Sequence, residues 1–161
     1  MGPSLKESAQ RVQDALTREN HPGRVRELLE NAHTAAQAAS ALHCEIAQIV
    51  KSLIFQGVRS QAPYLLLLGG NNRVDLTKVA SVLGEPVQRA DPDWVKSLTG
   101  FAIGGIPPIA HAVPIRTLMD EELFHYSELW AAAGHPHAVF LCNPQDLQRL
   151  TDAVVTDIHQ T

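Results

Sequence analysis

The sequence has few cysteines, no long apolar run and no signal-like start. Cys44 and Cys142 are its only cysteines, and without a Cys-x-x-Cys pair they favour buried small side chains over a disulfide, a redox pair or a structural zinc. No apolar run is long enough to span a bilayer. The segment Met1 to Gln10 lacks the basic start and apolar stretch of a signal peptide. We therefore expect a cytoplasmic protein with no membrane partner.

Positive charge is also scarce. Lysine and arginine number 13 against 17 acidic residues, a formal net charge of −4, which argues against a general nucleic-acid binder and against a DNA partner. A partner that presents one RNA end to a local basic site remains compatible with this balance. The length of 161 residues and the 45% hydrophobic content predict one domain over residues 1–161.

Apolar periodicity and turn residues predict interleaved helices and strands. We expect helices over residues 4–20, with Ser4 as N-cap, and over 34–42, 76–83, 91–99 and 144–150. We expect strands over residues 25–29, 46–55, 64–68 and 153–158 and near 87, and further apolar runs lie at 115–119 and 138–141. This order lacks a strict βαβ rhythm. It predicts an α/β (α+β) domain with a mixed sheet flanked by helices.

A lysine interrupts the first strongly apolar stretch, Ile46 to Phe55. Side chains alternate along a strand, so Lys51 shares a face with Leu53, and both faces of this strand are expected to be buried. Burying an ammonium without partners is costly, so Lys51 requires acceptors or a cleft. The alternative is an edge-strand lysine whose stem covers apolar surface, and the residues alone leave both interpretations open.

A glycine-rich and proline-rich loop covers residues 99–108. Glycines let a backbone approach a ligand closely or adopt positive φ, and successive free N–H groups can bind an anion or a developing oxyanion. The spacing fits neither a Walker loop nor a dinucleotide fingerprint. Taken alone, the pattern favours a tight connection over a binding loop.

Histidines and a short acidic cluster are the remaining candidates for chemistry. His111 follows the loop, and His135 and His137 form a His-x-His pair. Such a pair can bind a metal, but one surface and one core histidine are the commoner reason for it, so we predict no metal. Asp120 opens the acidic cluster and most simply begins a helix, where negative charge is favoured; a general-base role is the minority interpretation.

Taken together, these segments resemble the YbaK/ProX family, the relatives of the editing domain inserted in bacterial prolyl-tRNA synthetases. The resemblance runs from about Val25 to Ile158, and the Lys51 segment combined with a Gly-Gly-x-x-Pro loop makes it specific. The segments that carry it are Thr34–Ala39, Gln48–Phe55, Arg73–Leu76, Thr99–Pro108, Met119–Asp120 and Gly134–Phe140.

This resemblance implies a mixed, strongly curved sheet with surrounding helices and a cleft that holds the lysine. It implies hydrolysis of mischarged aminoacyl-tRNA in trans, without a metal or other cofactor. The expected substrate is a tRNA for proline that carries Ala, Cys, Ser, Thr or 2-aminobutyrate. The expected partner is the 3′ acceptor end of that tRNA, and a synthetase or elongation factor is a further candidate partner.

The resemblance also assigns site residues. The family lysine corresponds to Lys51, its glycine loop to Gly100, Gly104 and Gly105, and the histidine of some members to His137. The predicted catalytic residues are Lys51, Gly104, Gly105 and His137. The predicted substrate-binding residues are Ser52, Gly100, Ile106, Pro107, Pro108, His111 and Asp120.

Two positions depart from the family pattern. Pro107 replaces a serine found in many members, and Ala110 stands before His111 where the Pro-Pro subgroup usually has glycine. Both changes alter the loop expected to line the substrate pocket, so the identity of the edited amino acid stays open.

These residues suggest a mechanism and leave two alternatives. A protonated Lys51 would hold the terminal ribose and phosphate or the ester carbonyl, amides near Gly104 and Gly105 would stabilise the oxyanion, and His137 would position water. One alternative is a small-molecule ester hydrolase or ligand-binding protein on the same fold, which the acidic balance fits somewhat better. The other is a non-catalytic tRNA-binding or protein-binding module, and the lack of a basic, aromatic-rich stripe counts against it.

Overall fold

The fold is built around one long strand, β2 (Ile49–Gly57), which pairs with other strands on both of its edges. The computed structural model describes residues 4–29 and 32–161, so the first three residues of the segment 1–10 lie outside it. Its strands form an eight-stranded sheet in the order β1-β7-β6-β2-β3-β5-β8, with β4 attached to β2. The other strands are β1 (Val25–Glu27), β3 (Pro63–Gly69), β4 (Val87–Arg89), β5 (Arg116–Asp120), β6 (Leu129–Ala132), β7 (Ala138–Cys142) and β8 (Val154–Thr156).

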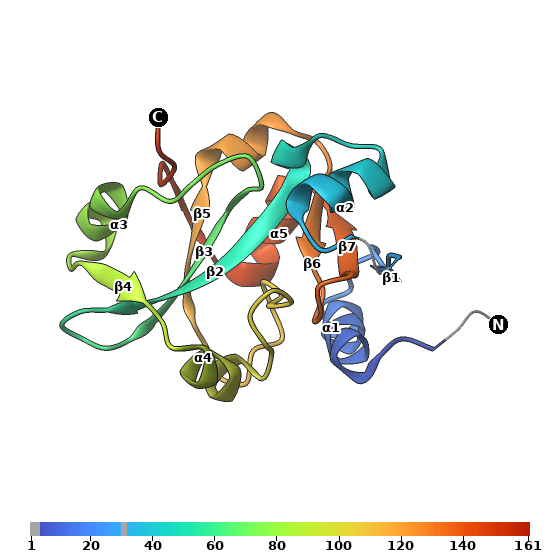
Figure 1. Ribbon diagram of the computed structural model, residues 1–161, viewed down its shortest axis with the longest axis horizontal. Helices are drawn as coiled ribbons and strands as arrows, with labels where there is room; N and C mark the ends of the chain where they lie inside the picture. Colours follow the sequence, from blue (N-terminus) through green and yellow to red (C-terminus); the bar gives the residue numbers. More distant parts are fainter. Residues whose placement is uncertain (1–3, 30–31) are drawn as a thin grey trace.

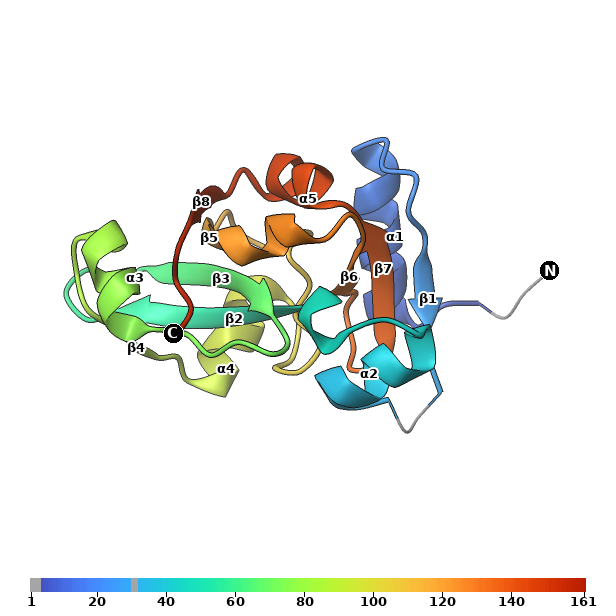
Figure 2. The ribbon, with the colours of Figure 1, turned by 90° about the horizontal axis from the view of Figure 1, so that it is seen from above.

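The sheet is mixed, as the residue pattern predicted, and strongly bent, as the family resemblance implied. Strand β2 is antiparallel to β3 and β4 but parallel to β6, and β3, β5 and β8 are parallel neighbours. Seen from above, β1, β6 and β7 run steeply across the direction of β2 and β3 (Figure 2). Strands β6 and β4 lie on either side of the middle of β2 (Figure 1).

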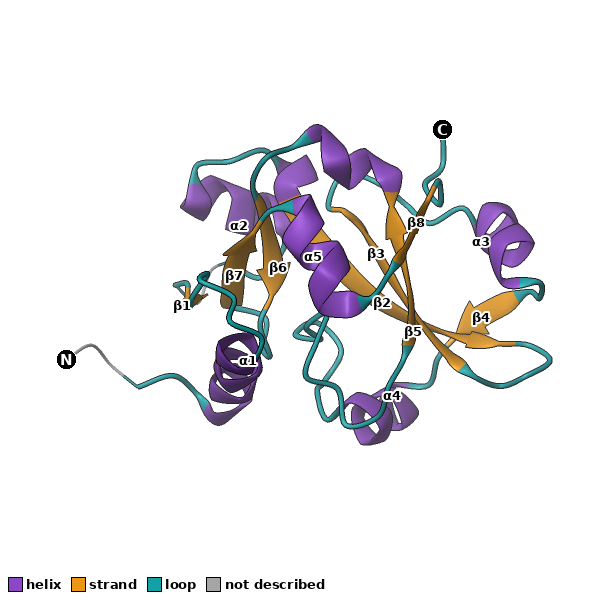
Figure 3. Ribbon diagram, turned by 180° about the vertical axis from the view of Figure 1, so that it is seen from behind, coloured by secondary structure: helices purple, strands orange, loops and turns teal. Residues whose placement is uncertain are grey.

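Helices cover the sheet on both sides. Helix α2 lies in front of the strands in Figure 1, whereas α5 lies in front of them in the view from behind (Figure 3). The helices are α1 (Glu7–Arg18), α2 (Ala35–Leu42), α3 (Leu76–Leu83), α4 (Pro92–Thr99) and α5 (Pro144–Thr151), with 3-10 turns η1 (Ile46–Gln48) and η2 (Glu121–His125). None of the described helices is long and apolar enough to cross a bilayer.

Polar side chains fix most helix starts where the sequence places them. A side-chain oxygen accepts backbone N–H groups at the start of α2, α3, α4 and α5, as N-cap residues do; the capping residues are Thr34, Asp75, Asp91 and Asn143. Helix α1 differs from the prediction. It begins at Glu7, and its N-cap is Lys6 without a side-chain bond, so Ser4 as N-cap is wrong.

Several strands also differ from the prediction: β1 ends at Glu27 and not at residue 29, and β8 covers only Val154–Thr156. Residues 46–48 form η1, in which the Glu45 amide donates to the Gln48 side chain at 2.9 Å and the Gln48 amide donates to the Glu45 carbonyl at 3.0 Å, so strand β2 begins only at Ile49. Strand β6 was not predicted at all. Its sequence is Leu-Trp-Ala-Ala, and alanine has little intrinsic preference for strands, so the tertiary contacts of the buried Ala131 decide its conformation.

Strand β3 is buried on both faces, which confirms the prediction for residues 64–68. Leu65 and Leu67 belong to the main core, while Leu66 belongs to a second core that includes Val79 of α3. All three leucines are fully buried. Strand β3 therefore packs into the core on both faces and pairs along most of one edge of β2.

A buried carboxylate ties the β2–β3 turn to the segment before β4. Both oxygens of Glu85 accept hydrogen bonds: Tyr64 Oη and Ser60 Oγ each donate at 2.6 Å, and the backbone amides of Arg59 and Ser60 donate at 2.9 and 3.0 Å. These donors, with the Ser60 hydroxyl first and Tyr64 next, lower the pKa of Glu85 from 4.5 to about 2.

We expect Glu85→Gln to lower the thermal midpoint of unfolding at neutral pH. The folded-state pKa of Glu85 lies below its unfolded value, so the carboxylate stabilises the fold above pH 4.5, and that stabilisation is lost as the pH falls through about 2. The difference in midpoint between wild type and variant should therefore shrink as the pH falls from 4.5 to 2. Glu121 is exposed, and none of the described hydrogen bonds or ion pairs involves its side chain, so Glu121→Gln is the control. A constant difference across this range would contradict the assignment.

Candidate functional site

Strand β2 has an unpaired stretch in the middle of one edge. Strand β6 pairs only with Ile49 and Val50, and β4 pairs only from Phe55 to Gly57. On the opposite edge, β3 pairs continuously from Val50 to Gln56. Within the described part of the chain, residues 51–54 therefore have no partner strand on the β6 and β4 side.

Backbone groups of two residues point into this gap. Successive residues of an antiparallel strand direct their hydrogen-bonding groups to opposite edges. On the β3 side, the Gly57 N–H donates to the Ala62 carbonyl at 2.9 Å. The odd-numbered residues of β2 therefore direct their backbone N–H and C=O groups toward β3. Ser52 and Ile54 accordingly direct their N–H and C=O groups toward the open edge.

A cavity of about 720 Å³ lies along this open edge. It is lined by residues of β2, β7, α2, α4 and the glycine-rich loop, most of them apolar. Among the described lining residues, the charged side chains are Lys51 and Arg89, and none is acidic. Although the whole chain has a net charge of −4, the charged residues among the described lining are both cations, which favours an anionic ligand.

Lys51 lies in this cavity with its stem half-buried. Its ammonium donates to the backbone carbonyl of Asn72, in the turn after β3. Burial lowers the pKa of Lys51 from its ordinary value, and the nearby positive charge of Arg73 lowers it further. The cleft interpretation of Lys51 therefore describes its position better than the edge-strand alternative.

Ser52 lines the same cavity from the opposite face of β2. The cavity wraps around an open strand edge and so reaches the side chains of both faces. The Ser52 hydroxyl is buried and has no hydrogen-bond partner among the described residues. An unpartnered buried hydroxyl costs free energy, and a bound ligand would supply the missing partner.

The glycine-rich loop contributes Gly104 and Ile106 to the cavity. Gly104 has φ 96°, which favours glycine, and its amide has no acceptor among the described residues. The Gly105 amide instead donates to the Ala102 carbonyl at 3.1 Å. A Cβ at Gly105 would lie 2.4 Å from the Cα of His135, so this glycine permits close backbone packing. Of these two glycine amides, that of Gly104 is therefore the one without an acceptor among the described residues.

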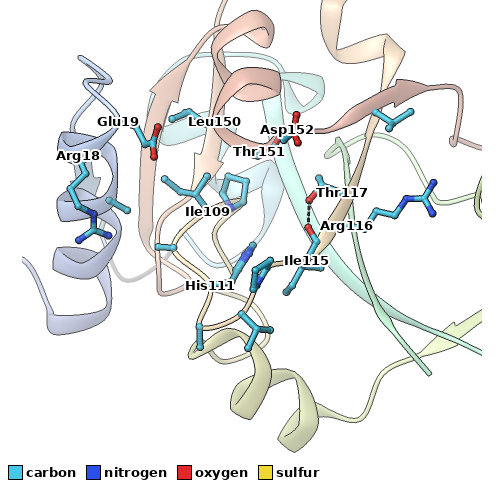
Figure 4. A pocket seen from close by; sticks show the side chains of 17 residues that line it. Arg18, Glu19, Ile109, His111, Ile115, Arg116, Thr117, Leu150, Thr151 and Asp152 are labelled. Carbon is cyan, nitrogen blue, oxygen red and sulfur yellow. Dashed lines mark hydrogen bonds between the residues drawn. The ribbon is translucent and has the colours of Figure 1, made fainter. Parts of the chain in front are cut away.

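Four other predicted residues lie away from the cavity. Gly100 ends α4 with φ 84°, and its carbonyl accepts a 2.8 Å hydrogen bond from Arg11. Pro108 and His111 line a second cavity of about 620 Å³ on the α1 and α5 side of the loop (Figure 4). His111 Nε2 donates to the carbonyl of the buried Pro107 at 2.7 Å, and burial lowers the pKa of His111. These four residues therefore do not line the cavity on the open edge of β2.

His137 lies behind the cavity wall. Its ring packs edge-on against His33, which lines the cavity, with centroids 4.5 Å apart. Its Nδ1 is buried and has no partner among the described residues. His135 Nδ1 accepts from the His137 amide, and His135 Nε2 hydrogen-bonds Glu27 at 2.6 Å. The His-x-His pair is thus one histidine fixed by hydrogen bonds and one that supports His33.

Asp120 belongs to a separate polar cluster near the C-terminus. It is fully buried, and its Oδ1 accepts from the Ile158 amide at 3.0 Å and from His159 Nδ1 at 2.9 Å. Asp120, Asp157 and His159 could hold a metal ion, since their ligand atoms lie within 4.8 Å of one another. The Lys78 ammonium already lies 3.0 Å from Asp157, and the hydrogen bond to Asp120 raises the pKa of His159. Groups of the chain itself, His159 and Lys78, therefore already contact the carboxylates of Asp120 and Asp157.

Sequence reasoning missed the open edge of β2, His33 and Arg89. His33 directly precedes the capping Thr34, and Arg89 ends the short strand β4; neither lies in a recognisable motif. The open edge depends on where β6 and β4 stop pairing, which is a property of the assembled sheet. No local signal in the sequence could have found these features.

Comparisons with known proteins agree with this arrangement. A family model for the aminoacyl-tRNA editing domain matches residues 29–150. A crystal structure of a protein proposed to be a trans-editing enzyme for prolyl-tRNA synthetase superposes with a TM-score of 0.94 at 46% identity, covering 98% of this chain and 100% of that one.

Two curated relatives extend the comparison. The uncharacterized protein YwhH of Bacillus subtilis (strain 168) is 26% identical over 144 residues, which covers 89% of this chain and 91% of that protein. The proline–tRNA ligase of Limosilactobacillus fermentum is 34% identical over 96 residues, 57% of this chain but only 17% of the ligase. The family model spans most of the chain, and the chain therefore belongs to the YbaK/ProX-like family of aminoacyl-tRNA editing domains.

Proposed function

We propose that this protein is a trans-editing hydrolase that deacylates tRNA for proline carrying a small amino acid. The observation that carries the proposal is the cavity on the open edge of β2, whose charged lining residues are Lys51 and Arg89. An RNA 3′ end is anionic, and an aminoacyl ester offers a carbonyl and an ammonium to exposed backbone groups. The cavity volume is within the range of small-molecule sites, and suits an aminoacyl group with part of the terminal nucleoside.

In the proposed mechanism, the protein orients a water molecule and stabilises an oxyanion. Water attacks the ester carbonyl carbon, the bond to the ribose oxygen breaks, and the products are the free amino acid and a tRNA with its terminal hydroxyl restored. Protonated Lys51 holds the terminal phosphate and ribose or the ester carbonyl. The free amide of Gly104 donates to the oxyanion, and the reaction uses no metal.

Ser52 and the histidines have supporting roles in this proposal. The unpartnered hydroxyl of Ser52 hydrogen-bonds the aminoacyl group. His33 lines the cavity and contacts the bound substrate, and the ring of His137 packs against the His33 ring and keeps it in place. Ile106 helps to set the size of the pocket. One methylene in such a pocket is worth only about 1–3 kcal/mol, so shape excludes proline more readily than it separates alanine from serine.

The substrate is tested with tRNAs for proline that carry Ala, Cys, Ser, Thr, 2-aminobutyrate or Pro. We expect release of at least one small amino acid and retention of Pro, because the ring of proline fits the pocket poorly. Free aminoacyl esters of the same amino acids should react more slowly, because they lack the anionic RNA end. Faster turnover of the free esters would instead support a small-molecule esterase, and tRNA binding without deacylation would support a binding module.

We expect Lys51→Ala and Lys51→Met to lower kcat/KM for the best substrate by about 100-fold, the usual effect of removing one donor to a developing charge. Lys51→Met keeps the apolar stem, so its thermal midpoint should equal or exceed that of wild type. The control is Lys96→Ala on the exposed face of α4, which should leave the activity unchanged. Wild-type turnover by both Lys51 variants would remove the proposed role of the ammonium.

We expect Ser52→Ala to separate activity from stability. The variant removes a buried hydroxyl that lacks a partner, so the thermal midpoint should stay the same or rise. The kcat/KM should fall by about tenfold, the loss of roughly one hydrogen bond to the substrate. Thermal melts and deacylation assays on the same preparation check this, and a loss of stability without a loss of activity would contradict it.

A further inference from the structure

The acceptor of the Lys51 ammonium is a main-chain carbonyl on a turn. Asn72 follows β3, and its amide donates to the Gly69 carbonyl at 2.9 Å. The Lys51 side chain reaches across the β2–β3 pair to the Asn72 carbonyl. A lysine stem has four rotatable bonds, so the position of its ammonium depends on where this carbonyl is held.

A second residue fixes the turn from outside. The Asn72 side-chain amide donates to a carboxylate oxygen of Glu122, in η2 directly after β5. A small cavity of about 50 Å³ beneath the turn is lined by both residues, together with Leu123 and Tyr126. The glycines at the start of the turn pack closely against Ala47 and Ile46, whereas the Asn72 side chain is held by its hydrogen bond to Glu122 beside this small cavity.

Glu122 is itself oriented by the cluster near the C-terminus. Its other carboxylate oxygen lies 3.8 Å from Nε2 of His159, and His159 Nδ1 donates to the buried Asp120. The described contacts thus link Asp120 through His159, Glu122 and Asn72 to the Lys51 ammonium, with hydrogen bonds at each step except the 3.8 Å contact between His159 and Glu122. Through these contacts, residues of β5, η2 and the C-terminal segment are connected to a lysine that lines the cavity.

We propose that Asn72 and Glu122 are positioning residues that hold the Lys51 ammonium in its reactive place at the open edge of β2. The inference rests on the proposed role of Lys51 in deacylation. Small displacements of a group that contacts the transition state have large effects on rate. The competing interpretation is that these contacts only attach η2 to the turn, in which case they stabilise the fold and leave catalysis alone.

The test compares Asn72→Ala, Glu122→Ala and the double variant. Each single variant should lower kcat about tenfold with KM changed less than about twofold, because the substrate still binds while the ammonium is misplaced. The double variant should be no slower than either single variant, because both remove the same hydrogen bond. Glu122→Gln keeps an acceptor for Asn72 and should retain most of the activity. Glu121→Ala, the exposed neighbour, is the matched control.

A second measurement reports on Lys51 without any turnover. Loss of the Glu122 carboxylate releases the Asn72 turn, whose carbonyl accepts from the ammonium. In Glu122→Ala the pKa of Lys51, followed by NMR of its side chain, should therefore fall below that of wild type. An unchanged kcat and an unchanged Lys51 pKa in both single variants would overturn the inference, as would strictly additive effects on kcat. Should Glu122→Ala not fold, Asn72→Ala and Glu122→Gln decide the question by the same two readouts.

The two proposals fail in different ways. Wild-type activity in Lys51→Met would overturn the proposed function whatever Glu122 does. Inactive Lys51 variants alongside fully active Asn72 and Glu122 variants would overturn only the positioning role.

Discussion

The pairing of β2 is the constraint on which the site depends. A central strand normally satisfies its backbone groups on both edges, but here β6 and β4 each pair with one end of β2 and leave its middle open. The strong bend of the sheet keeps these two strands apart. The buried leucines of β3 hold the opposite edge rigid. Exposed backbone donors and acceptors are therefore placed on an ordered strand, where their directions are fixed.

The charges of the cavity follow from the same arrangement. Lys51 is on the open part of β2, and Arg89 is the last residue of β4, which stops where the gap begins. None of the described acidic residues lines this cavity, and Asp120 and Asp157 already contact His159 and Lys78. A locally cationic site in an acidic protein needs no overall excess of basic residues.

Much of this structure could be predicted from the sequence, and what could not has a physical reason. Capping residues such as Thr34 and Asp75 fixed helix starts because their signals are local. Lys51 was identifiable because a charge within an apolar run needs an explanation. The different roles of Gly104 and Gly105 could not be predicted, because only the structure shows that the Gly105 amide donates to the Ala102 carbonyl. Contacts such as that of Asn72 with Glu122, which are 50 positions apart, have no local signature.

The open edge of β2 also bears on how this protein avoids self-association. An exposed strand edge can recruit a strand from another chain and start aggregation. Here the gap is only residues 51–54 long and is closed at both ends by β6 and β4, so an incoming strand could form few hydrogen bonds before meeting them. A short ligand fits where an extended polypeptide does not, so the same interruption that creates the site disfavours templated sheet growth on this edge.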